Sequence, residues 1–423
     1  MRVLIIGYVW PEPNSSAAGT RIVELMQAFN KADWEVHFAS AATPTQHQVD
    51  VQQLHVTAHN IALNCSSFNT FLTQLLPDIV VFDRFVSEEQ FGWRVAEAVP
   101  DALRVLDTED LHSLRQTRES LLKAAQAQHG AGALPITAQG PELYSAMLAQ
   151  GTILREVAAI LRSDISLVIS DTEIALLREL FSVPDYLLYH LPFMLTAKQI
   201  TATPGFDQRQ GFISLGNFRH APNWDAVLWL KQVLWPLIRA RLPGARLSVC
   251  GAYPPPKVTA LHNKREGFLV SGWVENSQAT IAQHRVCLAP LRVGAGIKGK
   301  LIDAMQTATP SVTTSIGAEA MQGDLPWPGA IADAPEAFAD NAVRLHQHLE
   351  DWQAASECAT PLLHTRYNGP VLGQQLTDAL GELKRALASH RQRHFLGQLM
   401  NHHTLRSSEF MSRWIEAKSR PSI

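Results

Sequence analysis

Hydrophobic residues along this chain form short unbroken runs that alternate with stretches of helical periodicity. The first run, R-V-L-I-I-G, ends in a glycine and is followed by a proline-rich loop. Apolar side chains then recur at spacings of three and four between Ile22 and Phe29, which predicts a helix with one apolar face. The run E-V-H-F-A-S predicts the next strand. Continuous apolar strands joined by helices are typical of a parallel sheet that is buried on both faces.

The same alternation continues through most of the chain. Further strands are predicted at residues 79–83, 103–107, 166–171, 211–216, 245–251, 267–272, 285–291 and 310–315. A chain of 423 residues is too long for one ordinary core. The sequence therefore predicts an α/β protein with two doubly wound, Rossmann-like domains that face one another across a cleft.

Domain boundaries are predicted from breaks in this rhythm. The first domain spans 1–195 and carries a helical insertion at about 112–163, which is a candidate for shaping a substrate site. A stretch at 190–210, rich in Pro and Thr and without periodicity, predicts the linker. The second domain spans 205–388, and a helical segment at 389–423 is predicted to pack back on the first domain.

That last segment allows a second interpretation. From residue 390 to the end it contains six Lys and Arg but two Glu, a local charge of +4. Packing on the first domain is the favoured reading, because apolar residues are numerous there and the charge is modest. Contact with anionic lipid is the alternative.

Composition narrows the class of protein. The net charge of −3 gives no global attraction to nucleic acid, so no nucleic-acid partner is expected. The four cysteines are scattered and show no metal-binding spacing. The apolar run at the start is too short for a signal peptide, and no stretch has the ~20 apolar residues of a membrane helix. We expect a cytoplasmic protein, with the inner face of the membrane as a further possible location.

The stretch L-R-V-G-A-G-I-K-G-K-L-I-D-A-M follows a predicted strand and opens a helix. Glycines such as Gly296 let the backbone approach a ligand, and the helix N-terminus favours an anion. Arg292, Lys298 and Lys300 add positive charge, which suits a pyrophosphate. Asp303, one turn on, would be repelled by phosphate and is expected to bind hydroxyls. Together they predict a sugar-nucleotide site; the alternative is a glycine turn with solvated lysines.

Two companion loops strengthen this interpretation. G-N-F-R-H-A-P-N-W-D at 216–225 opens with a glycine after a strand and carries Asn217 and Arg219. S-I-G-A-E-A-M at 315–321 places Glu319 behind a glycine. Carboxyl ends of parallel strands meet at one sheet edge, so the three loops are expected to lie together.

These motifs resemble glycosyltransferase family 4, whose members have the GT-B fold. The resemblance is carried by L-A-P-L-R-V-G-A-G-I-K-G-K-L-I-D-A-M, by T-P-S-V-T-T-S-I-G-A-E and by G-F-I-S-L-G-N-F-R-H-A-P-N-W-D-A. It covers most of the chain, is specific in 211–321 and loose in 40–165. It implies a retaining, metal-independent transferase that uses a nucleotide-activated sugar.

The resemblance also implies residue roles. Asp303 matches the second of two family glutamates spaced eight apart, the one that binds ribose. The first glutamate falls at Ala295 and is absent, and Glu319 is the candidate that partly replaces it. The family's phosphate-binding Arg and Lys align with Asn217 and Asn223. The cations near them in the sequence are therefore expected to neutralise the diphosphate: Arg219, Arg292, Lys298 and Lys300.

Further roles fall in both halves of the chain. Trp273 falls where the family has its nucleobase pocket, or else is a core aromatic. The segment D-T-E-D-L-H resembles the one that carries a histidine next to the transferred sugar, which makes Asp110 and His112 candidates; helix capping by Asp110 is the alternative. The loop W-P-E-P-N-S-S-A-A-G-T-R resembles the acceptor-side loop, with Gly19 and Arg21.

The predicted function is sugar transfer from a nucleotide-sugar donor to an acceptor hydroxyl, in surface polysaccharide or glycoconjugate synthesis. No metal site and no cofactor are expected; the acceptor is a glycan, a lipid-linked molecule or a protein, with possible peripheral membrane contact. The predicted donor-binding residues are Gly216, Asn217, Arg219, Trp273, Arg292, Gly296, Ile297, Lys298, Lys300 and Asp303. The catalytic candidates are Asp110, His112 and Glu319. The alternatives are a non-catalytic GT-B subunit and a sugar-nucleotide epimerase or hydrolase.

Overall fold

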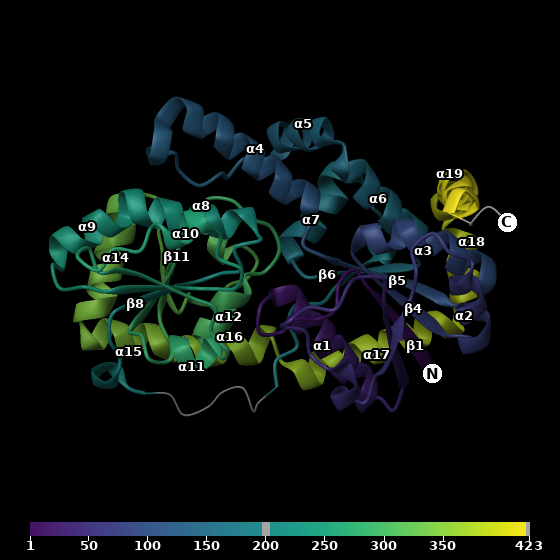
Figure 1. Ribbon diagram of the computed structural model, residues 1–423, viewed down its shortest axis with the longest axis horizontal. Helices are drawn as coiled ribbons and strands as arrows, with labels where there is room; N and C mark the ends of the chain where they lie inside the picture. The colour runs from purple at the N-terminus through teal and green to yellow at the C-terminus, as the bar shows by residue number, and fades with distance from the viewer. Residues whose placement is uncertain (197–203, 420–423) are drawn as a thin grey trace.

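The computed structural model describes residues 1–196 and 204–419 and places them in two α/β domains that lie side by side (Figure 1). The first domain is built on a parallel sheet with the strand order β3-β2-β1-β4-β5-β6-β7. Its strands are β1 (Arg2–Gly7), β2 (Glu35–Ser40), β3 (Thr57–Asn60), β4 (Ile79–Asp83), β5 (Leu103–Glu109), β6 (Ile165–Val168) and β7 (Leu188–His190). Its helices are α1 (Ala17–Lys31), α2 (Ser67–Leu75), α3 (Arg84–Ala98), α4 (His112–His129), α5 (Gly140–Gln150), α6 (Thr152–Arg162) and α7 (Asp171–Phe181).

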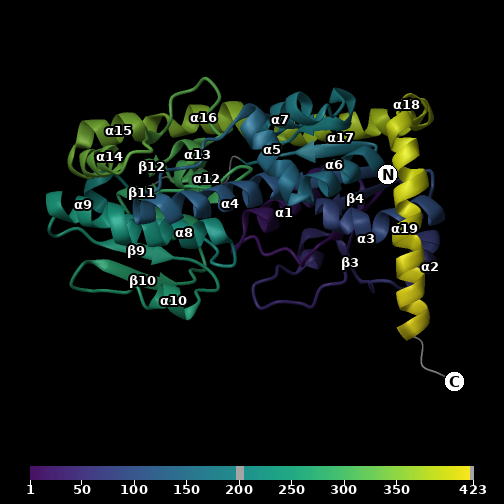
Figure 2. The same cartoon turned by 90° about the horizontal axis from the view of Figure 1, so that it is seen from above.

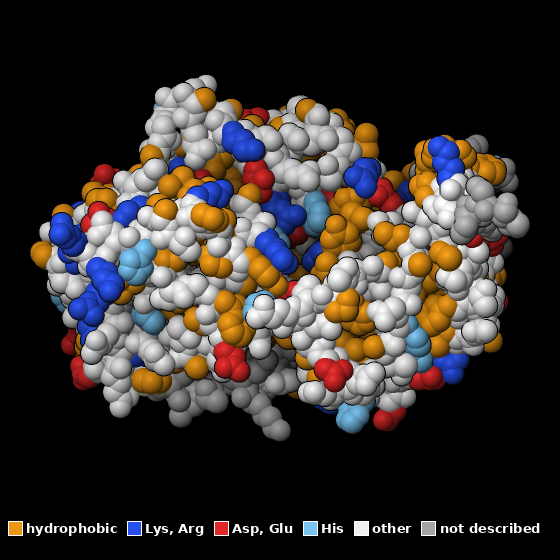
Figure 3. Space-filling view, viewed as in Figure 1, with side chains coloured by type: hydrophobic (Ala, Val, Ile, Leu, Met, Phe, Trp, Pro, Cys, Tyr) orange, Lys and Arg blue, Asp and Glu red, His pale blue; other side chains and the backbone are white. Residues whose placement is uncertain are grey.

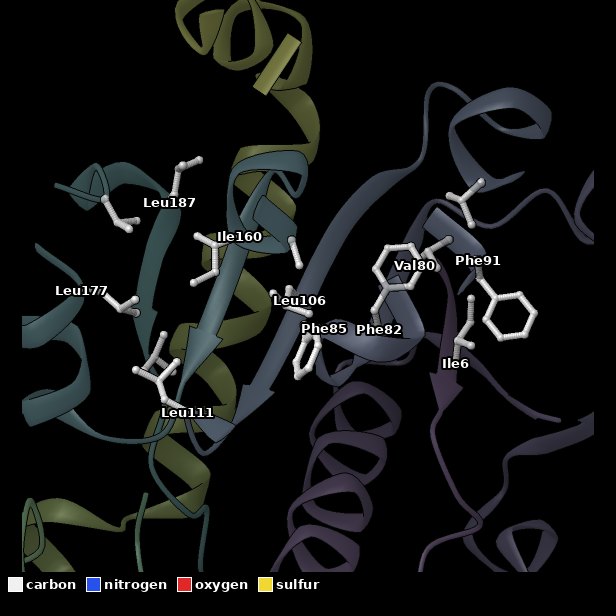
Figure 4. Packing of buried hydrophobic residues seen from close by; sticks show 14 of the residues in the cluster. Ile6, Val80, Phe82, Phe85, Phe91, Leu106, Leu111, Ile160, Leu177 and Leu187 are labelled. Carbon is white, nitrogen blue, oxygen red and sulfur yellow. The ribbon is translucent and has the colours of Figure 1, made fainter. Parts of the chain in front are cut away.

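Successive residues of the central strands point to opposite faces of this sheet, and both faces are covered. Val3 of β1 packs under α1, in a core that includes Phe29. Ile6 packs on the other face with residues of α2, α3 and α6, including Phe91 (Figure 4). Burial of each such side chain contributes about 1.5–3 kcal/mol. This two-sided burial explains why the strands appear in the sequence as unbroken apolar runs.

The second domain repeats the plan. Its parallel sheet has the order β10-β9-β8-β11-β12-β13. The strands are β8 (Phe212–Leu215), β9 (Leu247–Cys250), β10 (Phe268–Gly272), β11 (Val286–Ala289), β12 (Ser311–Thr313) and β13 (Gly329–Ile331). The helices are α8 (Ala221–Trp229), α9 (Trp235–Arg241), α10 (Pro256–Thr259), α11 (Ser277–Ile281), α12 (Gly299–Gln306), α13 (Ser315–Ala318), α14 (Pro335–Gln347), α15 (Leu349–Glu357) and α16 (Ala359–Arg366). The predicted doubly wound α/β architecture is confirmed.

The chain crosses between the domains twice, and the two crossings pair with each other. Part of the predicted linker at 190–210, residues 197–203, lies outside the described residues. Just before it, the backbone N–H of Leu195 donates to the oxygen of Tyr367 (2.9 Å), and the N–H of Gly369 donates to the oxygen of Leu195 (2.8 Å). The described part of the linker is thus tied to the returning chain.

The return crossing comes earlier than the predicted boundary at 388. Helix α17 (Gly369–Arg385) already packs on α1 of the first domain, and its Leu376 and Leu380 belong to that domain's core (Figure 1). The sequence shows the apolar stripe of α17 but not which domain it faces, because stripes of this kind look alike on either side of a crossing.

Two final helices follow, α18 (Leu387–Arg393) and α19 (Phe395–Ser419). Helix α19 runs along the outer edge of the first domain, where it contacts α3 and α6 (Figure 2). Among the described residues, no helix is both long enough and apolar enough to cross a bilayer.

The helices inserted between β5 and β6 do not stay over their own domain. Helix α4 reaches across to the second domain (Figures 1 and 2). In the connection between α4 and α5, the backbone N–H of Ile136 donates to the oxygen of Arg292 (2.9 Å). The insertion therefore bridges the two domains beside the junction of their sheets.

Candidate functional site

Loops from the carboxyl ends of both sheets meet between the two domains. Glu173, near the start of α7, accepts a hydrogen bond from the backbone N–H of Gly296 (N···Oε1 2.8 Å). The side-chain amide of Asn217 donates to the backbone oxygen of Ser15 (3.2 Å). Lys, Arg and His side chains gather in the hollow between the domains (Figure 3). The junction is the place where a doubly wound fold binds ligands.

Two lysines flank the N-terminus of α12. The ammonium of Lys298 donates to the backbone oxygen of Gly296 (2.7 Å), and that of Lys300 donates to Oδ1 of Asn223 (2.6 Å). Burial lowers the pKa of Lys298 below its ordinary value and lowers the pKa of Lys300 to about 8. Desolvated cations that bind neutral oxygens leave positive charge available to an anion.

The N-termini of two helices also meet here. A Cβ atom on Gly299, the first residue of α12, would lie 2.9 Å from the Cβ of Ala17, the first residue of α1. Each terminus carries the positive end of a helix dipole. An anion bound beside this contact would be favoured by both helix N-termini.

Asp303 lies one turn into α12 and already binds a hydroxyl group. Its carboxylate accepts hydrogen bonds from Oγ of Ser277 (2.8 Å) and from Nε2 of Gln278 (3.4 Å). Burial raises the pKa of Asp303 above its ordinary value. A carboxylate held in this way is suited to accept further O–H donors, such as those of a ribose.

Asp110 and His112 approach the glycine loop from the first domain. A Cβ atom on Gly296 would lie 2.8 Å from the Cβ of Asp110, so only a glycine allows this close packing. The carboxylate of Asp110 pairs with Arg115 (2.9 Å) and lies 3.7 Å from Nε2 of His112. The structure therefore brings the predicted sugar-side segment next to the predicted phosphate loop.

The two side chains have opposite protonation preferences. Burial lowers the pKa of His112 to about 4, so its imidazole is neutral at neutral pH. Burial raises the pKa of Asp110, but Arg115 and other cations outweigh this effect and hold the pKa below its usual range. The site thus presents a neutral base beside an ionised carboxylate.

Helix α4 is capped by a residue from another helix. The carboxylate of Glu156 on α6 accepts from the backbone N–H groups of His112 (2.7 Å) and Ser113 (3.1 Å). Burial raises the pKa of Glu156 to about 7. The capping role that was the alternative for Asp110 therefore belongs to Glu156, and this cap orients the backbone of His112.

Comparison with protein families identifies the second domain. Residues 209–348 match the family model described as glycosyl transferases group 1, and we call this part of the chain the glycosyltransferase domain. This glycosyltransferase domain contains the glycine loop, both lysines and Asp303. No curated protein matches the chain in sequence.

Solved structures share the architecture of the whole chain. Anabaena Alr3699/HepE in complex with UDP and glucose superposes with a TM-score of 0.66 at 10% identity and covers 90% of this chain and 99% of its own. Sucrose-phosphate synthase from Thermosynechococcus elongatus gives 0.66 at 15% identity, with 91% and 100% covered. WaaG, a glycosyltransferase of lipopolysaccharide biosynthesis, gives 0.58 at 12% identity, with 89% and 99% covered. These likenesses confirm the predicted GT-B fold; membership of family 4 stays a prediction.

Arg292 does not have the role expected from the sequence. Its guanidinium pairs with Asp225 on α8 (2.6 and 3.0 Å) and donates to the backbone oxygens of Ala131 and Ala133 (3.2 and 3.0 Å). It therefore ties the insertion to the glycosyltransferase domain instead of facing a diphosphate. Asp225 and the insertion are distant in sequence from Arg292, so its partners were not predicted.

Glu319 likewise needs a correction. Both of its carboxylate oxygens lie 2.7 Å from the guanidinium of Arg118 on α4. Burial raises the pKa of Glu319, but Arg118 outweighs this and holds the pKa below its ordinary value. This bidentate ion pair anchors the insertion to the second domain, so the geometry favours a structural role for Glu319 over a catalytic one.

The loop between β8 and α8 of the glycosyltransferase domain has a packed start at Gly216 and an exposed arginine at Arg219. A Cβ atom on Gly216 would lie 2.5 Å from Cγ of Asn223, so the glycine makes room for this asparagine. Arg219 is exposed, and its guanidinium lies over the ring of Tyr253, 3.4 Å from the centroid. Of the predicted phosphate-binding cations, Lys298 and Lys300 therefore lie at the N-terminus of α12, whereas Arg219 lies on the exposed surface of the loop between β8 and α8.

Trp273 is not a core residue. It is 39% exposed, and its ring stacks on His47 of the first domain (centroids 4.6 Å apart, planes at 21°). Tyr253 meets the same imidazole edge-on at 5.5 Å, and its hydroxyl donates to the carboxylate of Glu12 (3.1 Å). Trp273 thus lies on an aromatic contact between the domains.

Three further predicted residues have structural roles. Ile297 is buried in an apolar cluster with Ile169, so its side chain does not line the site. A Cβ atom on Gly19 would lie 2.5 Å from the backbone of Glu12, which explains the glycine. Arg21 is fully buried and pairs with Asp107 (2.8 Å), so it is not an acceptor-binding group.

Sequence reasoning missed Glu173, which joins the domains. Its Oε1 accepts from Gly296 and from the N–H of Leu111 (3.1 Å). Burial, with Asp110 nearby, raises the pKa of Glu173 to about 8. A glutamate in the first turn of a helix gives no local sign of such a contact. Among residues 1–196 and 204–419, no three His, Cys, Asp or Glu side chains group to hold a metal ion.

Proposed function

We propose that this protein transfers a sugar from a nucleotide-sugar donor to an acceptor hydroxyl. One observation carries the proposal: the N-termini of α1 and α12 abut at Gly299 and Ala17, with Lys298 and Lys300 beside them. Two dipole ends and two desolvated ammonium groups concentrate positive charge at one point. A diphosphate is the ligand whose charge matches this arrangement.

The proposed chemistry rests on charge stabilisation. When the bond between the sugar and the diphosphate breaks, negative charge develops on the departing phosphate oxygens. Lys298, Lys300 and the N–H groups at the start of α12 are positioned to stabilise that charge. Asp303 accepts hydrogen bonds from the ribose hydroxyls, which fixes the donor relative to the cations.

The first domain supplies the opposite wall. The neutral imidazole of His112 and the ionised carboxylate of Asp110 accept hydrogen bonds from sugar hydroxyls, or receive the proton of the acceptor hydroxyl. The packing of Gly296 against Asp110 keeps this pair close to the phosphate loop.

The finer features belong to the same proposal. The transferase is a retaining enzyme of family 4, in which the lysines take the place of a divalent cation, and it uses no cofactor beyond the donor. Its acceptor is a glycan, a lipid-linked molecule or a protein in surface polysaccharide or glycoconjugate synthesis, and it works in the cytoplasm. The resemblance of the sequence motifs supports these points.

A second candidate function is a non-catalytic GT-B subunit. Its support is the engagement of charged groups near the loop: Arg292 is held by Asp225 and Glu319 by Arg118. Ala295, at the place of the family's first glutamate, is buried in the core of the first domain. Such a protein would bind a nucleotide sugar or a partner enzyme without turnover.

Thermal unfolding with a panel of nucleoside diphosphates and sugar nucleotides tests the binding site. A ligand at a hundred times its Kd stabilises the protein by about 2.7 kcal/mol. Lys298→Met and Asp303→Asn are expected to abolish the shift, whereas Lys264→Met, at an exposed lysine of the same domain, leaves it unchanged. A shift that survives both site variants would exclude the proposed site.

Release of nucleoside diphosphate from the bound sugar nucleotide then separates the two functions. Turnover that is lost in His112→Ala supports the transferase. Binding that Lys298→Met abolishes, without turnover in the presence of a broad acceptor mixture, supports the subunit.

A further inference from the structure

Helix α19 packs on the first domain through polar side chains. Asn401 accepts a hydrogen bond from Nη1 of Arg104 (3.0 Å), and Ser412 accepts one from Nη2 of Arg94 (3.2 Å). Glu416 accepts from the serine hydroxyl that precedes α2 (2.6 Å). Spacings of eleven and four residues place these three side chains on one face of the helix. The described hydrogen bonds between α19 and the first domain are therefore made by polar side chains.

The outward face of the same helix is apolar. Large hydrophobic side chains there are between 43% and 69% exposed. They are Phe395, Leu396, Leu399, Phe410, Met411 and Trp414. At 100° per residue they fall within about half of the helix surface, opposite the polar contacts. Figure 3 shows hydrophobic side chains at this edge of the molecule. We call these six residues the α19 stripe.

An ordinary surface helix buries its apolar side chains, whereas α19 leaves the six residues of the stripe exposed. Contiguous exposed apolar side chains on a folded protein mark an interaction surface. The polar contacts of α19 also hold the helix in place without using the stripe. The stripe is thus available to an apolar partner.

Charge decides which partner fits. Residues 390–423 carry six Lys and Arg and two Glu, a formal charge of 6 − 2 = +4. Arg391 pairs with Asp164 and Arg413 with Glu97 of the first domain, which leaves a balance of 4 − 2 = +2. The ammonium of Lys418 lies 4.0 Å from the ring centroid of Trp414, at the border of the stripe. Arg393 is exposed at the other end of the segment. A second copy docked by the same face would bring two segments of net positive charge together, which opposes self-association.

We propose that α19 binds the surface of an anionic membrane. Its stripe enters the boundary between headgroups and acyl chains, and its Lys and Arg side chains contact the anionic headgroups. The aromatic residues at both ends of the stripe suit this amphipathic layer. The proposal concerns the membrane contact alone and does not depend on sugar transfer.

Sedimentation of the full chain with lipid vesicles tests the proposal. The protein is expected to bind vesicles of phosphatidylcholine with phosphatidylglycerol, and to bind pure phosphatidylcholine at least tenfold more weakly. The double variant Phe410→Ser, Trp414→Ser is expected to lose at least tenfold in affinity. Leu349→Ser and Val371→Ser, at exposed apolar positions on other helices, form the matched control and should bind as the native protein does.

Charge is tested separately. Lys418→Glu is expected to weaken binding to the anionic vesicles about fivefold or more, with the difference shrinking as salt is raised. Thermal unfolding without lipid checks that each variant is folded.

Two results would overturn the proposal. One is equal binding of the native protein and the double variant to anionic vesicles, or no binding by either. The other is a dimer, seen by sedimentation velocity without lipid, that the double variant abolishes; the stripe would then belong to a second copy.

Discussion

Arg118 and Glu319 form a bidentate ion pair that joins the inserted helix α4 to the glycosyltransferase domain, with both N···O distances at 2.7 Å. The same guanidinium donates to the backbone oxygen of Gly294 in the glycine loop (2.7 Å). One side chain from the first domain thus holds a carboxylate and a loop of the second. The insertion is part of the scaffold of the proposed donor site.

Arg118→Ala is therefore expected to lower the free energy of unfolding by about 2–3 kcal/mol, because Glu319 keeps a largely desolvated charge without its partner. Denaturant titration measures this loss. The matched control is Arg344→Ala, which removes one member of the exposed pair Arg344–Asp351 and should cost about 0.5 kcal/mol or less. Equal losses in the two variants would contradict the anchoring role of Arg118.

The lowered pKa of Lys300 predicts how the affinity for a nucleoside diphosphate depends on pH. Its pKa is about 8 because of burial, so the fraction of charged ammonium falls as pH rises through 8. Affinity for a nucleoside diphosphate should therefore be greatest below pH 7 and decline between pH 7 and 9. Lys300→Arg should flatten this decline, because a guanidinium stays charged throughout. Titration calorimetry at several pH values checks both expectations, and an unchanged slope in the arginine variant would refute the assignment.

The raised pKa of Glu173 predicts how the free energy of unfolding depends on pH. Its folded pKa of about 8 lies above the ordinary 4.5, so between these values the folded state holds a proton that the unfolded state has lost. Stability then falls as pH rises through this window, by up to about 1.4 kcal/mol per pH unit for this group. Glu173→Gln keeps an oxygen acceptor for Gly296 but does not titrate. The variant should gain stability relative to the native protein from pH 5 to 8, and a constant difference would contradict the raised pKa.

Replacing the buried Arg21 and the exposed Arg219 with alanine should have very different effects on stability. Arg21→Ala should destabilise the protein by about 3–5 kcal/mol, because it leaves the fully buried Asp107 unpaired. Arg219→Ala, at an exposed position over Tyr253, should change stability by less than about 1 kcal/mol. Thermal and denaturant unfolding measure both. If Arg21→Ala kept native stability and lost only acceptor binding, Arg21 would instead be an acceptor-binding residue.

Much of the fold could be predicted from the sequence because its strongest signal is two-sided burial. Strands such as β1 and β4 are unbroken apolar runs, and each was predicted within a residue or two. The strands that were missed are β3 (T-A-H-N), β7 (L-Y-H) and β13 (G-A-I). All three lie at sheet edges, where a short polar or mixed run suffices because one side is unpaired.

The candidate site divides in the same way. The placement of Lys298, Lys300 and Asp303 at the start of α12 follows from local spacing, and the structure has them there. The partners of Arg292 and Glu319 cannot be predicted from local spacing. Arg118 and Glu319, for example, are 201 residues apart in sequence. A single sequence shows which residues carry charge, but it does not show which of them neutralise each other across a domain boundary.

The return of the chain through α17 has a consequence for synthesis. Leu376 and Leu380 complete the core beneath α1, yet they are translated after the whole glycosyltransferase domain. As the chain leaves the ribosome, the second domain can close its own sheet while the first domain still exposes the core residues that α17 covers. The order in which the domains complete their folding is then the reverse of the order in which they are translated. The N-terminal domain is synthesised first but is completed last.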